Sequence, residues 1–193
     1  MGSFSLSFFK KILIFSILFV AFSAFGDVKI EGVKLPATMK CADQDIALSG
    51  HGLRTATFFK IKIYVAGFYA REKITSSNLE KLAQRPLCFS FTYLKDFSDS
   101  DVDRAWNYQF EESSEHNYPN FKDDIKLLKS FFGKIHGERN QVIELSQDST
   151  FFYENSKPVG EIKGADFQKA FLSIWFGKKP PTEELKKSLL GHN

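Results

Sequence analysis

Arg54 and Tyr64 are the two residues whose types and spacing suggest chemistry at a single site. They lie on a predicted β-hairpin with arms over 46–53 and 58–70, with Arg54 near the tip-side end of the first arm. The second arm is rich in aromatic and β-branched residues, which favour strands. An arginine keeps its charge, and its planar fork fits a carboxylate or a phenolate. Arg54 on such a sheet therefore requires an anion or a polar oxygen as its partner.

Alternation along the second arm predicts which side chains share a face with Tyr64. Successive side chains of a strand point to opposite faces, so Lys62, Ala66 and Phe68 lie with Tyr64 on what is the less apolar face. A buried tyrosine hydroxyl needs a partner, and in a tight hairpin Arg54 comes close to the same face. The pair would then form the cationic, hydrogen-bonding end of an apolar pocket. The alternative is an arginine paired with a local acid beside a half-exposed tyrosine.

Motifs of other familiar sites are absent from the sequence. It contains no nucleophile elbow, phosphate loop or dinucleotide fingerprint. The four histidines are scattered without ligand spacing, so we expect neither a metal nor a cofactor. Trp106 and Trp175 occur at helical spacing and are interpreted as core residues.

Residues 1–26 have the pattern of a secretory signal peptide. Two lysines precede an uncharged apolar run over 12–22, and small residues stand at Ala24 and Gly26. The apolar run is shorter than the roughly 20 residues of a membrane span. We therefore expect cleavage after Gly26, leaving one domain over 27–193 in an exported compartment, the periplasm in a bacterium. The alternative is an uncleaved anchor.

The charge balance excludes a partner that is recognised mainly by charge. The precursor has a formal net charge of +3, and the two lysines of the predicted leader leave +1 on the mature chain. Basic and acidic residues also alternate rather than cluster. This balance argues against nucleic acid or an anionic membrane as the main partner.

Cys41 and Cys88 are the two cysteines of the chain. In an oxidising compartment an even count favours a disulfide. Two buried free thiols remain the alternative, because the sequence does not determine the Cα separation that a bridge requires.

The order of predicted elements indicates an α+β fold. Strands are predicted over 28–35, 46–53, 58–70, 87–97, 141–146, 150–154 and 158–162. Helices are predicted from Ser77 to Gln84 with a capping box at Glu80, after Ser98, after Pro119, over 167–175 and after Thr182. Strands followed by helices, twice over, predict a mostly antiparallel sheet with helices packed on one face.

Two segments resemble the chalcone isomerase superfamily. The motif G-x-x-L-R followed by FFKIKIYVAGFYA resembles the first hairpin of that superfamily. The C-terminal ADFQKAFLSIWFGKKPPTEELKKSLLG looks like its closing helices, and the elements between them come in a fitting order. The resemblance covers 28–191 and is greatest to bacterial exported members called chalcone isomerase-like. It implies the open-faced sandwich fold of that family.

The resemblance implies a ligand site at Arg54. In the plant enzyme of the family, which closes a chalcone to a flavanone, the matching arginine polarises or holds the substrate. Tyr64 stands where the enzyme has a threonine. An arginine paired with a tyrosine is instead similar to the fatty-acid-binding relatives, in which the two hold a carboxylate.

Most of the enzyme's other site residues have no counterpart here. Its active-site tyrosine falls in 95–101, which contains no tyrosine, and its late hydroxyl residue falls at Ile174. Its asparagine falls near Asn107, and Ser173 stands next to Ile174. The ligand-binding residues that the resemblance implies are Arg54, Tyr64, Asn107 and Ser173.

We therefore expect a non-catalytic protein that binds a small apolar molecule with an acidic head, such as a fatty acid. The apolar wall is expected from the sheet and from the helical stripe of Phe167, Phe171 and Ile174. One alternative is an isomerase, an intramolecular lyase, with Arg54 acting on a chalcone-like phenolic ligand. Another is a periplasmic interaction or structural module in which Arg54 forms a structural salt bridge.

Overall fold

The computed structural model describes residues 26–72, 85–113 and 118–192. The leader predicted over 1–26 lies outside these residues except for Gly26, and the helix predicted from Ser77 to Gln84 lies outside them entirely. Across the described ranges, no helix is both long enough and apolar enough to cross a bilayer.

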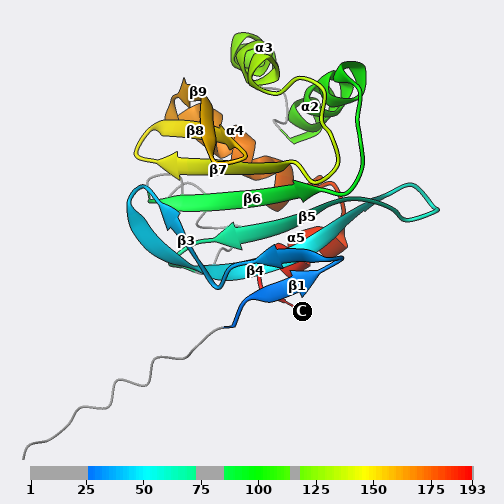
Figure 1. Ribbon diagram of the computed structural model, residues 1–193. Helices are drawn as coiled ribbons and strands as arrows, with labels where there is room; N and C mark the ends of the chain where they lie inside the picture. The colour runs from blue at the N-terminus through cyan, green and yellow to red at the C-terminus, as the bar shows by residue number, and fades with distance from the viewer. Residues whose placement is uncertain (1–25, 73–84, 114–117, 193) are drawn as a thin grey trace, which may run out of the picture.

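In the described residues, seven antiparallel strands form one curled sheet in the order β3-β4-β5-β6-β7-β8-β9 (Figure 1). They are β3 (Thr38–Cys41), β4 (Gln44–Ala56), β5 (Ile61–Tyr69), β6 (Leu87–Tyr93), β7 (Asn140–Ser146), β8 (Ser149–Glu154) and β9 (Lys157–Lys163). Each strand pairs with the strand next to it in sequence order, so the sheet is a meander. The expected mostly antiparallel sheet is confirmed.

A separate hairpin of β1 (Val28–Ile30) and β2 (Val33–Leu35) precedes the sheet. The single strand predicted over 28–35 is therefore wrong. The chain reverses at Glu31 and Gly32, which have positive φ angles of 49° and 84°. Glycine adopts this region without steric cost, so it supplies the turn that the alternation of side chains concealed.

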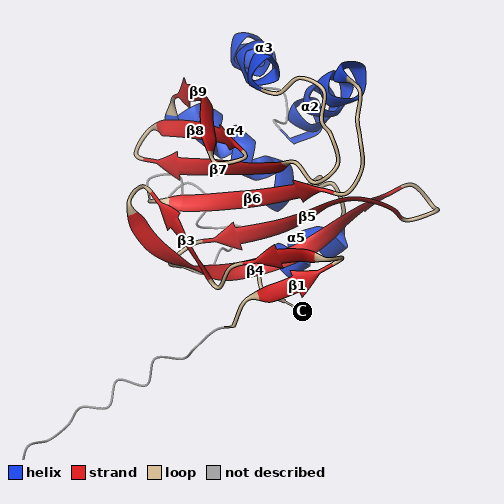
Figure 2. Ribbon diagram, in the orientation of Figure 1, coloured by secondary structure: helices blue, strands red, loops and turns tan. Residues whose placement is uncertain are grey.

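The helices cover the concave face of the sheet (Figure 2). They are α2 (Asp99–Ser113), the 3-10 helix η1 (Tyr118–Phe121), α3 (Lys122–Phe131), α4 (Ala165–Phe176) and α5 (Glu183–Leu189). Two predicted N-caps are confirmed, since Ser98 Oγ accepts from the Asp101 amide and Thr182 Oγ1 accepts from the Leu185 amide, each at 3.2 Å. The α+β class with helices packed on one face is confirmed.

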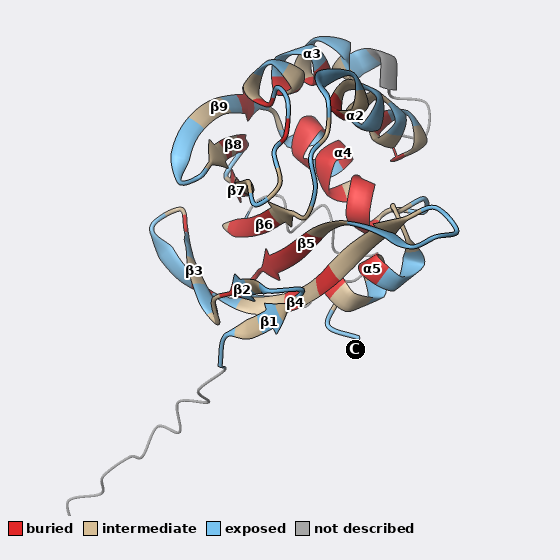
Figure 3. Cartoon of the chain, turned by 45° about the vertical axis from the view of Figure 1, so that its right-hand side comes forward, coloured by how far each residue is buried: buried red, intermediate tan, exposed pale blue. Residues whose placement is uncertain are grey.

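Helix α4 lies between the sheet and α2 and is buried along most of its length (Figure 3). Its rings interlock with those of neighbouring elements: the ring centroids of Phe167 and Phe110 are 5.8 Å apart, and those of Phe171 and Phe152 are 5.9 Å apart. The space below the first turns of α4 is therefore filled by side chains.

The Tyr64 face of β5 is the main core face. Ala66 and Phe68 are buried in the main core, and Tyr64 packs against it. The prediction that this face is the less apolar one is wrong. Lys62, which made it look polar, lies exposed where β5 leaves the body of the protein toward the hairpin tip.

A second, smaller core lies on the other side of the sheet around a disulfide. Cys41 of β3 and Cys88 of β6 are bonded, with their Cα atoms 5.9 Å apart. Ile46 and Tyr69 pack with them. Strands β4 and β5 separate β3 from β6 in the sheet, so the curl of the sheet is what brings the two cysteines together.

Candidate ligand-binding site

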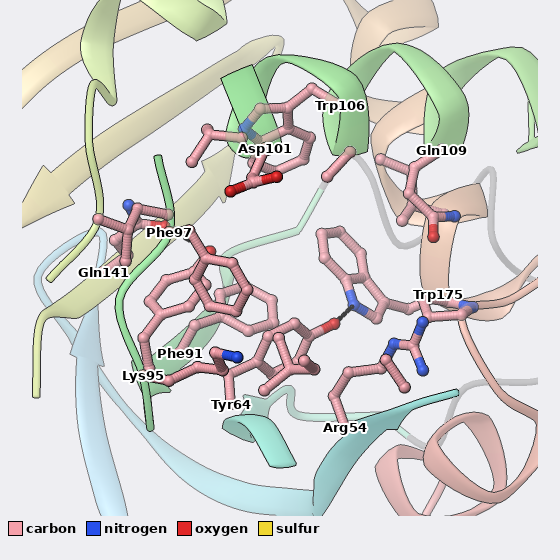
Figure 4. Close-up of a pocket in the computed structure, with 18 of the residues that line it drawn as sticks. Arg54, Tyr64, Phe91, Lys95, Phe97, Asp101, Trp106, Gln109, Gln141 and Trp175 are labelled. Atoms are coloured by element: carbon pink, nitrogen blue, oxygen red, sulfur yellow. Dashed lines mark hydrogen bonds between the residues drawn. The ribbon is translucent and has the colours of Figure 1, made fainter. Parts of the chain in front are cut away.

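Arg54 and Tyr64 are direct cross-strand partners in the β4–β5 hairpin. The pairing register shifts between Arg54 and Thr55, as at a β-bulge, and bulges re-aim the side chains beside them. Both side chains line one cavity, where they point toward Trp175 of α4 (Figure 4). The structure therefore brings these two residues together as the sequence predicted.

The cavity has a volume of about 430 Å³, within the range of roughly 300–1,000 Å³ of small-molecule sites. It lies between strands β5 to β7 and helix α2. Its floor includes Ile63, Tyr64, Phe91, Tyr93, Gln141 and Ile143, and its roof includes Val102, Ala105 and Trp106. Most of this lining is apolar, so the cavity suits an apolar ligand body.

The Tyr64 hydroxyl is held by an indole. Trp175 Nε1 donates a hydrogen bond to the Tyr64 oxygen at 3.1 Å. The Tyr64 ring also packs edge-on against Phe91 and Tyr93, with centroids 5.2 and 5.7 Å apart. Because the oxygen accepts the indole bond, the proton of the hydroxyl remains available for an acceptor in the cavity.

The protonation states of the pair suit an anionic ligand group. Burial lowers the pKa of Arg54, an effect opposed by the nearby Tyr64, but an arginine remains charged at neutral pH. Burial raises the pKa of Tyr64 to about 12, opposed by the bond from Trp175 and the charge of Arg54. At neutral pH the site therefore presents a fixed cation beside a neutral hydroxyl donor.

Arg54 is not neutralised by an acid within the described part of the chain. Its Nη1 donates to the backbone carbonyl of Thr55, and no described carboxylate forms an ion pair with it. A guanidinium carries five donors in a planar fork. Donors of Arg54 therefore remain for a ligand or for solvent, and a salt bridge to a local acid is not found among the described residues.

A second polar pair lies at the β7 side of the cavity. The Tyr93 hydroxyl donates to Gln141 Oε1 at 3.1 Å, and Gln141 Nε2 is buried without a partner among the described groups. Burial and the neighbouring Tyr64 raise the pKa of Tyr93. Sequence reasoning missed both residues. The available signal was the parity of Gln141 with Ile143 and Leu145, whose side chains are buried.

The described residues include no group of three or more His, Cys, Asp or Glu side chains that could hold a metal ion. The polar lining consists of two cations (Arg54 and Lys95), two carboxylates (Asp96 and Asp101), two tyrosine hydroxyls and two glutamine amides. Both carboxylates are already bonded elsewhere, Asp96 to the Gly137 amide and Asp101 to Ser98 and Arg104.

The chalcone isomerase-like family matches residues 27–191 of this sequence. This chain belongs to the chalcone isomerase-like family. Its fold is similar to that in the crystal structure of a fatty-acid binding protein of Arabidopsis thaliana, with a TM-score of 0.70 and 14% sequence identity. The similarity covers 85% of this chain and 95% of the plant protein, and at this identity it concerns the fold. No curated protein matches the sequence.

Two residues that the family resemblance suggested do not line the cavity of this chalcone isomerase-like protein. Asn107 of α2 is absent from the lining, whereas its neighbour Trp106 is part of it. The Ser173 hydroxyl donates to the Lys169 carbonyl of its own helix at 2.8 Å. The match to the family's site positions therefore fails at these two residues, because the helix faces that reach the cavity belong to their sequence neighbours.

The predicted apolar wall also needs correction. Ile174 lines the cavity, but Phe167 and Phe171 do not, because their rings pack into the core between α4, α2 and the sheet. Trp106 and Trp175, interpreted from the sequence as core residues, pack with the core and line the cavity as well.

Proposed function

We propose that this chalcone isomerase-like protein binds an apolar carboxylic acid, such as a fatty acid, and does not catalyse an isomerisation. The observation that carries the proposal is Arg54, a half-buried guanidinium beside an apolar cavity with no carboxylate partner among the described residues. A hydrogen bond to a charged group contributes about 1.5–3 kcal/mol. Each methylene that the ligand buries adds about 0.8 kcal/mol.

In the proposed pose the carboxylate lies between Arg54 and Tyr64. The guanidinium supplies the charge, and the hydroxyl supplies a donor oriented by Trp175. The tail runs across the strands toward Ile143, beneath α2. This path spans the three strand spacings from β4 to β7, or about 14 Å.

Two further observations support the proposal. The plant protein of similar fold is a fatty-acid binding protein. The enzyme's active-site tyrosine has no counterpart in 95–101, so the residues that would support isomerisation are incomplete. We also propose that the protein acts in an exported compartment, because disulfides such as Cys41–Cys88 form and persist under oxidising conditions.

The test compares an acid with its methyl ester. Arg54→Met removes the charge and keeps an apolar stem, so calorimetry is expected to show the acid binding about tenfold more weakly or worse. The affinity for the ester is expected to change little, because the ester carries no charge. Tyr64→Phe is expected to act in the same direction with a smaller effect. Arg85→Met, at an exposed ion pair with Glu72 away from the cavity, is the matched arginine control.

Three outcomes would contradict the proposal. If the wild-type protein binds no acid of any tail length, apolar carboxylic acids are excluded as its ligands. Turnover of a chalcone by wild type, lost in Arg54→Met, would favour the isomerase. A lowered melting temperature of Arg54→Met with an unchanged preference for acid over ester would make Arg54 a structural residue.

A further inference from the structure

The tip of the β4–β5 hairpin exposes two neighbouring phenylalanines. Phe58 is 95% exposed and Phe59 is 84% exposed, and their rings contact each other edge-on at 6.0 Å. Ile61, the first residue of β5, is 41% exposed. The tip projects beyond the rest of the sheet (Figures 1 and 3). Side chains of the protein's own core therefore do not cover this apolar group.

The requirements of the turn do not explain why two phenylalanines stand at the tip. The amide of Lys60 donates to the carbonyl of Thr57 at 3.1 Å, which makes Phe58 and Phe59 the central residues of a β-turn. Such turns favour Gly, Pro, Asn, Asp and Ser. Thr57 and Lys60 have φ angles of 63° and 49° in the left-handed region, which is costly for a β-branched residue such as threonine. The strained turn presents its two most apolar side chains to the outside.

The tip lies beside the mouth of the cavity. Ala56 and Ile61 form the last pair of the hairpin, and Ala56 lines the cavity together with Arg54 and Ile63. Lys95, also exposed, lines the same cavity from the loop after β6. A surface that binds the tip would therefore lie close to the cavity entrance.

The composition of the tip fits a lipid bilayer better than another protein surface. A stable protein interface buries about 1,200–2,000 Å² in total, whereas two phenylalanines offer about 150–250 Å² each. Insertion into a bilayer needs no matching surface. Lys60 and Lys62 flank the rings, and lysines can lay their stems along apolar surface while their charged heads stay in water.

The local charge adds attraction to anionic lipids. Lys62 pairs with Glu31 at 2.6 Å, but no described carboxylate pairs with Lys60 or Lys95. Basic residues near a membrane surface are attracted to anionic headgroups. The near-neutral charge of the whole chain excludes strong electrostatic binding, so the aromatic pair must supply the main part of the interaction.

We propose that Phe58 and Phe59 insert into the surface of a bilayer containing anionic lipids and hold the cavity mouth against it. An apolar acid concentrates in such a bilayer, so docking would let the acid pass between membrane and cavity without crossing water. The docking itself does not depend on the proposed function, so an experiment can refute either proposal without refuting the other.

Flotation of the chain without its predicted leader tests the docking; that chain carries every described element. Wild type is expected to float with mixed phosphatidylcholine and phosphatidylglycerol vesicles. Phe58→Ser/Phe59→Ser is expected to reduce vesicle binding at least about tenfold, since both rings lose their contact with lipid. Leu127→Ser on α3, another exposed apolar position at 43% exposure, is expected to bind as wild type does.

A tryptophan at the tip gives a second measurement that does not depend on loss of function. In Phe58→Trp, the added fluorescence is expected to shift to the blue and to be quenched by brominated lipids when vesicles are present. Equal flotation of wild type and Phe58→Ser/Phe59→Ser, or no response of Phe58→Trp, overturns the proposal. A concentration-dependent dimer in sedimentation that disappears in the double serine variant overturns it in favour of self-association.

Acid binding is measured separately in solution. Vesicle docking without any acid binding would refute the proposed function and leave the docking intact. Acid binding without vesicle docking would refute the docking and leave the proposed function intact. If both hold, the rate at which a fluorescent fatty acid moves from vesicles to protein is expected to fall in the double serine variant.

Discussion

Arg54, Tyr64 and Trp175 form a short chain of contacts that joins the hairpin to helix α4. Arg54 and Tyr64 are cross-strand neighbours, and the Trp175 indole donates to the Tyr64 oxygen. The indole sets which way the hydroxyl can donate, so Trp175 contributes to the site through Tyr64. The arrangement leaves one positive charge and one free hydroxyl proton directed at an apolar space.

The raised pKa of Tyr64 predicts a loss of stability at alkaline pH. The pKa of about 12 in the folded state exceeds the usual value of 10.0, because burial disfavours the phenolate. The unfolded chain therefore releases this proton first, and the free energy of unfolding falls as pH rises from about 10 to about 12. Below pH 10 this contribution is fully present.

Denaturant unfolding of wild type and Tyr64→Phe across this pH range checks the prediction. The variant is expected to lose less stability than wild type between the two pH values, because it has no proton to release. The lysines, which also titrate there, are common to both proteins and cancel in the comparison. Parallel curves for the two proteins would show that Tyr64 ionises as freely as an exposed tyrosine.

The hairpin β4–β5 serves both the site and the core, and it changes character along its length. Its inner half pairs Gly50 with Phe68 and Gly52 with Ala66 under helix α5, and the next pair on the same face is Arg54 with Tyr64 at the cavity. The outer half extends beyond the helices to the exposed tip (Figure 1).

Helix α5 approaches β4 so closely that two glycines are required beneath it. A Cβ atom on Gly52 would lie 2.9 Å from the Cβ atom of Ser188, and one on Gly50 would overlap the backbone carbonyl of Leu189. Gly50→Ala is therefore expected to lower the free energy of unfolding by about 1–3 kcal/mol, as overpacking typically does. Denaturant titration measures the loss.

Gly133→Ala is the matched control, since its nearest neighbour would be Asp99 Oδ1 at 3.4 Å, an ordinary contact for an added methyl group. An equal effect at Gly50 and Gly133 would mean that α5 moves away from β4 at no cost.

The disulfide connects an edge strand to the middle of the sheet. It closes a loop with a sequence separation of 47 residues between Cys41 and Cys88. Cys41→Ala/Cys88→Ala is expected to lower the free energy of unfolding by about 2–4 kcal/mol, because the unfolded chain regains the freedom that the bond removed. Reduction of the wild-type protein is expected to give a similar loss. Free thiols that alkylate without reductant in protein from its own compartment would contradict the bond.

The molecule as a whole is a curled sheet with helices packed on its concave face, and its cavity lies at one end of the space between them. At the other end, phenylalanine rings from α2, α4 and β8 fill that space. The cavity opens beside the exposed hairpin tip, so the binding site and the proposed membrane contact lie on one side of the molecule.

We predict that the exported protein begins at Asp27, because the small residues Ala24 and Gly26 suit signal peptidase. Intact-mass measurement of protein from its native compartment checks this. A dominant membrane-bound species that retains residues 1–26 would favour an anchor.

The fold class and the central pair of the site could be predicted from the sequence. Periodicity identifies strands and helices because it reflects which side of each element is buried. A tight hairpin brings residues ten positions apart to adjacent strands, which is why Arg54 and Tyr64 were expected to meet. These are local consequences of chain geometry.

The tertiary structure alone decided which apolar side chains fill the core and which line the cavity. Phe171 and Ile174 belong to the same helical stripe, but Phe171 packs against Phe152 in the core whereas Ile174 lines the cavity. The same holds for Gln141, which is buried beside β6 and accepts a hydrogen bond from Tyr93 of that strand. Periodicity shows that a side chain faces inward, but whether it finds a partner or a space depends on elements far away in the sequence.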